Sequence, residues 1–495
     1  MVASLLAADY PGEIATPTPK ALIHLVQRRY GVQVSYSTAW RGKKEAADDV
    51  RVTPEEGFRL MYWYMFMLEK MNPDTVSYVE VDEEHKFKYL FFALGASIEG
   101  FRVMRKVIIL DGTHLKTAYG GVLLVATTQD PDHHHYPLAF GVVDGENNES
   151  WFWFLEKLKS LIPYGPEIVF VSDRNFSLLR AIAMLYPLSH HGHCIYHLSQ
   201  NVKGKVIGVN KAICAKKFRQ CARAYTEAEF LQLYCDFSST YPSARLYLHE
   251  HTEIKHWARC YFPGEKYNLD TSNAVESING VLENARNYSL LQMIDAIIEK
   301  MIKWFAKHRK ASAEISTAQK LVPFVEKELH KTCKEAKLLV VNELNCYRLE
   351  YSVIGSDGLQ YVVNLRSKTC SCKQFDIEKY PCVHAVAAAR EAKKEADPEI
   401  QLHDLCSKYY WIDLWVLTYS RTIYLVPNSC QWIVPEETMK RLILPPDYDV
   451  KQGRRQEKRY ASAGEDRDKG GKKKSKKSKK PTGTSEWLDN DGDQN

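Results

Sequence analysis

The chain has 495 residues and is 45% hydrophobic, which is too long for one core and points to about three domains of roughly 150 residues each. Residues 451–495 hold 14 Lys and Arg against 8 Asp and Glu, which accounts for the whole formal net charge of +6. A basic DNA-binding surface on the body would therefore need local segregation of charge. There is no secretory leader pattern, and the most apolar stretch, 409–426, is charged and short for a bilayer, so we expect a soluble intracellular protein whose 12 cysteines are reduced.

The first half of the chain predicts helices followed by strands. Residues 1–100 are predicted to form a mainly helical region, in which Pro54 opens an aromatic-rich helix. A helical pattern at 150–161 lies among short apolar runs that are typical of buried strands, at 107–110, 122–127, 137–143 and 168–172. This order predicts a strand meander, then a helix, then a further strand.

The second half predicts helices and a small separate domain. Helical composition rich in Lys, Tyr and Cys runs from 202 to 267, and helical spacing of apolar residues returns at 289–309. We assign 311–336 to a helical connector and 337–400 to a small domain, in which the glycines at 355 and 358 predict a β-hairpin. The remaining segments are a C-terminal extension, 401–450, and a basic tail, 451–495, that is too polar to fold.

Two aspartates follow apolar runs directly. Asp111 ends the run at 107–110 and Asp173 ends the run at 168–172, so each is expected to project a carboxylate from the C-terminal end of a buried strand. An aspartate at a strand end is also a common turn or cap residue, and Asp173 could cap a helix that begins near Ser177. The residues alone leave both interpretations open.

A cysteine-histidine cluster follows the predicted hairpin. Cys370 and Cys372 are separated by nine residues from Cys382 and His384, which together supply three thiolates and one imidazole. This is the ligand set of a closed structural Zn²⁺ site. The last two ligands precede a probable helix at 385–394, so the metal is expected to pin a hairpin against a helix in a segment too small to fold by itself.

Ordered sequence motifs resemble the Mutator-like (MULE) transposases over about 18–446. The motifs that carry the resemblance are Asp111-Gly112-Thr113-His114-Leu115-Lys116, Pro137-Leu138-Ala139-Phe140, Ser150-Trp151-Phe152-Trp153-Phe154-Leu155, Ser172-Asp173-Arg174, Cys194-Ile195-Tyr196-His197 and Thr271-Ser272-Asn273-Ala274-Val275-Glu276-Ser277-Ile278-Asn279. The cysteine-histidine spacing resembles a SWIM zinc finger, which follows the nuclease domain in such proteins.

The resemblance implies an α/β fold with an RNase H-like nuclease core at 101–310 and a helical insertion at about 202–267. It also implies a catalytic triad of Asp111, Asp173 and Glu276 that holds two Mg²⁺ or Mn²⁺ ions. An alternative for the last acid is a capping box formed by Asn273 and Glu276 at the start of a helix. Cys194 and His197 recur in the family and imply a supporting metal site with a structural or catalytic role; the alternative is burial as ordinary core residues.

The implied function is that of a nuclear DNA transposase, an enzyme that hydrolyses phosphodiesters at transposon ends and joins the freed end to target DNA. Its partners would be terminal inverted repeats, target DNA and further copies of itself. The first alternative is a domesticated, non-catalytic DNA-binding transcriptional regulator on the same fold. In a second alternative the SWIM module mainly binds proteins. The lysine run at 472–480 fits nuclear import or nucleic-acid contact, or simply a solvated tail.

Overall fold

The computed structural model describes residues 2–9, 17–49, 53–117, 119–162, 164–206, 211–267, 269–270, 278, 280, 282–283, 285–316, 318–394 and 400–447. Two parts of the sequence analysis therefore lie outside the described residues. They are Glu276 with the motif around it, 271–277, and the basic tail, 451–495.

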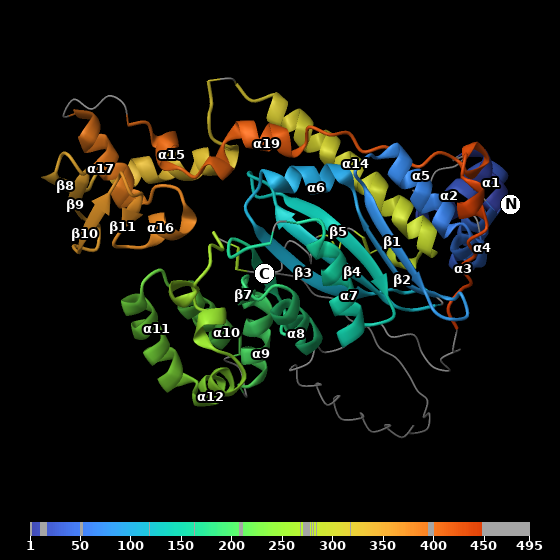
Figure 1. The fold of residues 1–495 in the computed structure, drawn as a ribbon, viewed down its shortest axis with the longest axis horizontal. Helices are drawn as coiled ribbons and strands as arrows, with labels where there is room; N and C mark the ends of the chain where they lie inside the picture. The colour runs from blue at the N-terminus through green and yellow to red at the C-terminus, as the bar shows by residue number, and fades with distance from the viewer. Residues whose placement is uncertain are drawn as a thin grey trace, which may run out of the picture.

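A seven-stranded mixed sheet forms the centre of the protein, in the order β1-β2-β5-β4-β3-β6-β7 (Figure 1). Its strands are β1 Val76–Val81, β2 Phe87–Ala93, β3 Val107–His114, β4 Val122–Gln129, β5 His135–Val143, β6 Val169–Ser172 and β7 His190–His193. The strands from β1 to β3 pair antiparallel, whereas β3, β6 and β7 run parallel. Strands β3 to β5 are buried on both faces, which explains why they read as continuous apolar runs.

Helices cover both faces of this sheet (Figure 1). On one face, α7 (Asn148–Lys159) packs with α8 (Phe176–Leu185), and the Phe154 ring of α7 lies directly over Gly141 of β5. On the other face lie α6 (Gly95–Arg102) and the long helix α14 (Leu290–Ala313), whose Phe305 ring packs 5.4 Å from that of Tyr136.

The amino-terminal region contributes more than the predicted helices. Its helices are α1 Val2–Asp9, α2 Pro19–Tyr30, α3 Tyr36–Asp49, α4 Pro54–Arg59 and α5 Met61–Met71. Residues 76–93, assigned to the same helical region, instead form a β-hairpin whose second strand pairs with β5, Leu90 opposite Val142. The predicted boundary at residue 100 therefore divides the sheet, because edge pairing between distant segments leaves only a weak local signal.

Most of the described residues between 202 and 267 are helical, and these helices pack around a core of their own (Figure 1). They are α9 Ile195–Gly204, α10 Lys211–Arg223, α11 Glu227–Thr240 and α12 Pro242–His251. Phe218, Phe237 and Trp257 are buried at the centre of this group. These helices separate β7 from α14 along the chain.

The small domain contains a four-stranded sheet in the order β11-β10-β9-β8. Its elements are β8 Val340–Asn345, β9 Glu350–Ile354, β10 Gln360–Asn364, β11 Thr369–Cys370, α16 Gln374–Glu378 and α17 Val383–Lys394. The predicted hairpin is confirmed, since β9 and β10 pair antiparallel around a turn in which Gly358 has a φ of 77°. The connector is α15 (Pro323–Ala336), which packs on α17.

The C-terminal extension returns over the central sheet rather than ending at the small domain. It contains α18 Leu402–Leu405, α19 Ile412–Thr418 and α20 Glu436–Met439. Leu444 exchanges backbone hydrogen bonds with the β1–β2 turn, at 2.9 Å to Phe87 and 2.8 Å to His85. Among the described residues, no helix combines the length and the apolar character that a bilayer crossing needs.

A buried carboxylate joins the extension to the β4–β5 turn. Asp130 is fully buried and accepts hydrogen bonds from Trp415 Nε1 at 2.7 Å, from Tyr419 Oη at 3.0 Å and from the backbone N–H of His134 at 2.7 Å. The histidine run 133–135 beside Asp130 also contacts other elements. The ring of His133 stacks 3.9 Å from that of Phe324 at the start of α15.

We predict that Trp415→Phe lowers the free energy of unfolding by about 1–3 kcal/mol, because it leaves the buried Asp130 carboxylate short of one donor. The measurement is the shift of the urea unfolding midpoint of the full chain. Trp411→Phe is the matched control, since the buried Nε1 of Trp411 has no hydrogen-bond partner among the described residues. Equal shifts in the two variants would contradict the role given to Asp130.

Candidate functional site

The parallel pairing of β3 with β6 brings Asp111 and Asp173 together. Leu110 is the register partner of Ser172, so the two aspartates follow at adjacent positions on strands that lie about 4.8 Å apart. Both are largely buried, with 9% and 8% of their surface exposed. Carboxylates held this close repel each other unless a cation or a proton neutralises them. The pair therefore has the chemistry of a divalent-cation site.

Asp173 does not cap the helix that follows it. The cap of α8 is Asn175, whose Oδ1 accepts hydrogen bonds from the backbone N–H groups of Ser177 at 2.9 Å and Leu178 at 3.2 Å. The backbone N–H of Asn175 in turn donates to Asp173 Oδ1 at 3.0 Å. The helix start thus orients the Asp173 carboxylate and leaves its other oxygen outside the cap.

Glu146 is a third carboxylate at this edge, and the sequence analysis did not select it. Its Oε2 accepts a hydrogen bond from Asn175 Nδ2 at 3.1 Å. Its carboxyl group lies over Gly112, the residue after Asp111, so closely that a Cβ atom there would meet the Glu146 Cδ at 2.8 Å. Glu146 follows β5 in the loop before α7, at the same end of the sheet as the two aspartates. The position of Glu146 just after a predicted strand is the sequence feature that could have identified it as a candidate.

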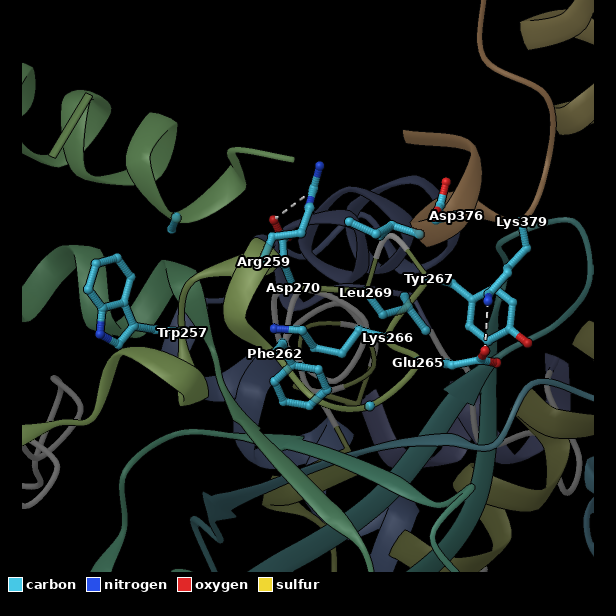
Figure 2. A pocket seen from close by; sticks show the side chains of 13 residues that line it. Trp257, Arg259, Phe262, Glu265, Lys266, Tyr267, Leu269, Asp270, Asp376 and Lys379 are labelled. Atoms are coloured by element: carbon cyan, nitrogen blue, oxygen red, sulfur yellow. Dashed lines mark ion pairs between the residues drawn. The ribbon is translucent and has the colours of Figure 1, made fainter. Parts of the chain in front are cut away.

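The described residues on either side of the Glu276 motif contact other parts of the protein. Asp270 pairs with Arg223 at 2.6 Å and with Arg259 at 3.7 Å, and its carbonyl accepts a hydrogen bond from the backbone N–H of Ile195 at 2.8 Å (Figure 2). On the other side of the motif, Ile278 is buried in the main core. Glu276 itself stays a prediction.

The helices at 211–267 meet the small domain near Asp270, as Figure 2 shows. Lys379 at the end of α16 forms an ion pair of 2.7 Å with Glu265, and a cavity of about 80 Å³ lies beside them. Lys266 lines this cavity, and burial lowers its pKa to about 8. Charged contacts therefore connect the two units, and the spacing of residues in sequence did not predict them.

Cys194 lies next to the strand end that carries Asp173, and His197 follows it in the first turn of α9. Cys194 precedes α9, and its backbone N–H donates to the Ser172 carbonyl at 2.7 Å, one residue before Asp173. Both side chains are buried, at 1% and 7% exposure. Within the described ranges, neither belongs to a group of three metal-ligating side chains.

The predicted zinc ligands converge. The ligand atoms of Cys370, Cys372, Cys382 and His384 all lie within 4.8 Å of one another, and His384 Nδ1 is 3.7 Å from Cys370 Sγ and 3.9 Å from Cys382 Sγ. Hydrogen bonding among the three thiols lowers the pKa of Cys372 and raises that of Cys370 to about 12. Three sulfurs and one nitrogen at this separation suit tetrahedral Zn²⁺.

Neighbouring groups hold these ligands in place. The backbone N–H of Cys370 donates to Asp376 Oδ2 at 2.8 Å, and the imidazole of His384 stacks 3.9 Å from the ring of Tyr361. The Tyr361 hydroxyl donates to Asp357 in the hairpin turn at 2.6 Å. The hairpin and α17 are thus organised around the four ligands, as the sequence spacing predicted.

Comparison with known protein families agrees with this architecture. The family model described as the MULE transposase domain matches residues 107–201, and the SWIM zinc finger matches residues 361–393. The chain therefore carries a MULE transposase domain followed by a SWIM zinc finger. The first match contains Asp111, Glu146 and Asp173, and the second contains all four zinc ligands.

Known relatives are of two kinds. "Protein FAR-RED IMPAIRED RESPONSE 1" of Arabidopsis thaliana is 23% identical over 46% of this chain and 28% of its own length. "Transposase for insertion sequence element IS905" of Lactococcus lactis is 25% identical over 40% of this chain and 52% of its own length. "Protein FAR1-RELATED SEQUENCE 4" of Arabidopsis thaliana is 21% identical over 65% of this chain and 48% of its own length. The chain thus spans between about a quarter and a half of these relatives.

Proposed function

We propose that this protein is a DNA transposase that uses divalent metal ions to cleave phosphodiesters at transposon ends and to transfer the freed strand into target DNA. The observation that carries the proposal is that Asp111 and Asp173 directly follow Leu110 and Ser172, the last register pair of the parallel strands β3 and β6, inside the matched transposase domain. The relation to an insertion-sequence transposase supports it.

The proposed fold of this domain is RNase H-like. Support comes from the order of strands, in which the antiparallel meander β3-β4-β5 is extended on the β3 side by the parallel strands β6 and β7. In the proposed site, Asp111, Asp173 and Glu276 would hold the two ions. Bound Mg²⁺ or Mn²⁺ would supply charge stabilisation to the attacked phosphate.

The chain's own residues set up this chemistry before any ion binds. Asn175 orients Asp173, and the β3–β6 register fixes the spacing of Asp173 from Asp111. Oxygen ligands suit hard divalent cations, whereas the thiolate and imidazole cluster of the SWIM finger suits Zn²⁺. We therefore assign the catalytic ions to the acids and a structural role to zinc.

A second candidate function is a non-catalytic DNA-binding regulator on the same fold. It is favoured by relatives that are named as a far-red response protein and a related sequence rather than as transposases. The two functions differ in one measurable outcome, which is metal-dependent nicking of DNA that carries the terminal repeats flanking the coding region. Absence of flanking repeats and of nicking would favour the regulator.

The remaining parts of the proposal concern location and partners. We place the protein in the nucleus, with DNA as its main partner, further copies of the chain at paired transposon ends, and the SWIM finger as a surface for DNA or protein. The tail at 472–480, with seven lysines, would import the protein and add affinity for DNA of any sequence.

We predict that deleting residues 467–480 flattens the salt dependence of DNA binding without changing sequence preference, because lysines that contact phosphates release counterions. The checks are the slope of log affinity against log salt concentration and the nuclear fraction of a fluorescent fusion. A deletion that changes neither would leave the segment as a solubilising tail.

A further inference from the structure

Arg286 lies close to the acid site although it is remote from β3 in sequence. It belongs to the short helix η3 (Ala285–Asn287), just before α14. Its carbonyl accepts a hydrogen bond of 2.9 Å from the backbone N–H of Lys116, and its own N–H donates to the Leu282 carbonyl at 3.1 Å. The backbone of Arg286 is therefore attached to the segment that leaves β3.

The side chain of Arg286 reaches the same face of the sheet as Asp111. Its Nη1 donates a hydrogen bond to Thr113 Oγ1, across 173 residues of sequence. Thr113 follows Asp111 by two positions on β3, so both side chains project from one face and lie about 7 Å apart along the strand. The guanidinium therefore contacts the residue that is next to Asp111, the proposed metal ligand, on the same face of β3.

The positive charge of this guanidinium is only partly compensated within the described part of the chain. Arg286 forms no ion pair with a described carboxylate, and its Nε is buried without a hydrogen-bond partner. Burial lowers the pKa of Arg286, and the acid that partly offsets this, Glu283, is itself paired with Lys116 at 3.6 Å. A partly desolvated charge without a partner is costly, so the arrangement is best explained by an anion that binds there.

We infer that Arg286 binds a backbone phosphate of the DNA strand that enters the acid site. A guanidinium presents donors in a planar fork that fits two phosphate oxygens, and Thr113 sets its orientation. The inference rests on the proposed function, because that function makes DNA the substrate. It adds a phosphate-binding position that lies beside the acids and is separate from the SWIM finger and the tail.

The test measures DNA binding by the full-length, zinc-loaded protein, with a labelled duplex of mixed sequence and no catalytic metal. Arg286→Gln should lower the affinity and reduce the slope of log affinity against log salt concentration by about 1, the value for one lost phosphate contact. Arg286→Lys should keep the slope, since the charge remains, but bind more weakly because the fork is lost. Arg102→Gln is the control, as Arg102 ends α6, before the start of β3, and is exposed.

Arg286→Met keeps the aliphatic stem, and it provides the same measurement if the Gln variant fails to fold. A slope equal to that of the wild type in the folded neutral variants would overturn the inference. In nicking assays the neutral variants should raise KM more than they lower kcat, because the contact is present before the reaction begins. The wild type could bind DNA but never nick it, while Arg286→Gln still reduces the slope of log affinity against log salt concentration. In that case the enzyme proposal fails and the phosphate contact stands.

Discussion

Asp111→Asn and Asp173→Asn are each expected to lower metal-dependent nicking of terminal-repeat DNA by at least about 1,000-fold, or roughly 4 kcal/mol of transition-state stabilisation. Each variant keeps the size of the side chain and removes the negative charge that would hold a divalent ion. The folded state should not suffer, because both carboxylates are buried at adjacent strand positions and loss of one charge relieves repulsion. Rates would be measured with Mg²⁺ and Mn²⁺ separately.

The controls for this experiment separate loss of chemistry from loss of structure. Asp413→Asn changes an exposed aspartate on α19 and should leave the nicking rate unchanged. The unfolding midpoint of the metal-free Asp173→Asn protein should equal or exceed that of the wild type. Normal metal-dependent nicking by either site variant would remove the acid pair from the mechanism. A wild type that never nicks terminal-repeat DNA would favour the regulator.

Cys370→Ser and Cys382→Ser are expected to reduce bound zinc from one equivalent to less than half and to unfold the small domain. Zinc binding in isolated zinc-finger peptides has an apparent free energy of roughly 10–16 kcal/mol, which exceeds what the core of so small a segment can supply. Metal analysis of the full chain measures the zinc content. Hydrogen exchange over residues 340–394 measures the loss of structure.

Cys346→Ser is the matched control, because Cys346 lies in the same small domain, is exposed and is remote from the ligand group. It should retain one equivalent of zinc and normal exchange protection. A wild type that holds less than half an equivalent, or that keeps its protection in chelator, would contradict the zinc site. Exchange in the seven-stranded sheet should change less than exchange in the small domain, because the two sheets share no strand, although their buried residues belong to one continuous core.

Features that depend on local sequence were predicted well. The ligand spacing from Cys370 to His384 predicted that the four ligands lie together. A turn and the start of a helix bring such nearby residues together whatever the rest of the chain does. The hairpin around Gly358 and the strands that end near Asp111 and Asp173 follow from turn chemistry and from continuous apolar runs in the same way.

Features that depend on register and on long-range packing were decided only by the tertiary structure. Glu146 meets Gly112 because β5 and β3 end at the same edge of the sheet, and Arg286 reaches Thr113 because the chain returns after the helices at 211–267. Trp415 donates a hydrogen bond to Asp130 across 285 residues of sequence, so that the buried turn residue connects the C-terminal extension to the sheet. The sequence by itself determined which residues have the chemistry for zinc and for divalent cations. Only the packing of distant segments decided which charges stand beside the acids, because side chains far apart in sequence meet through strand register and not through spacing.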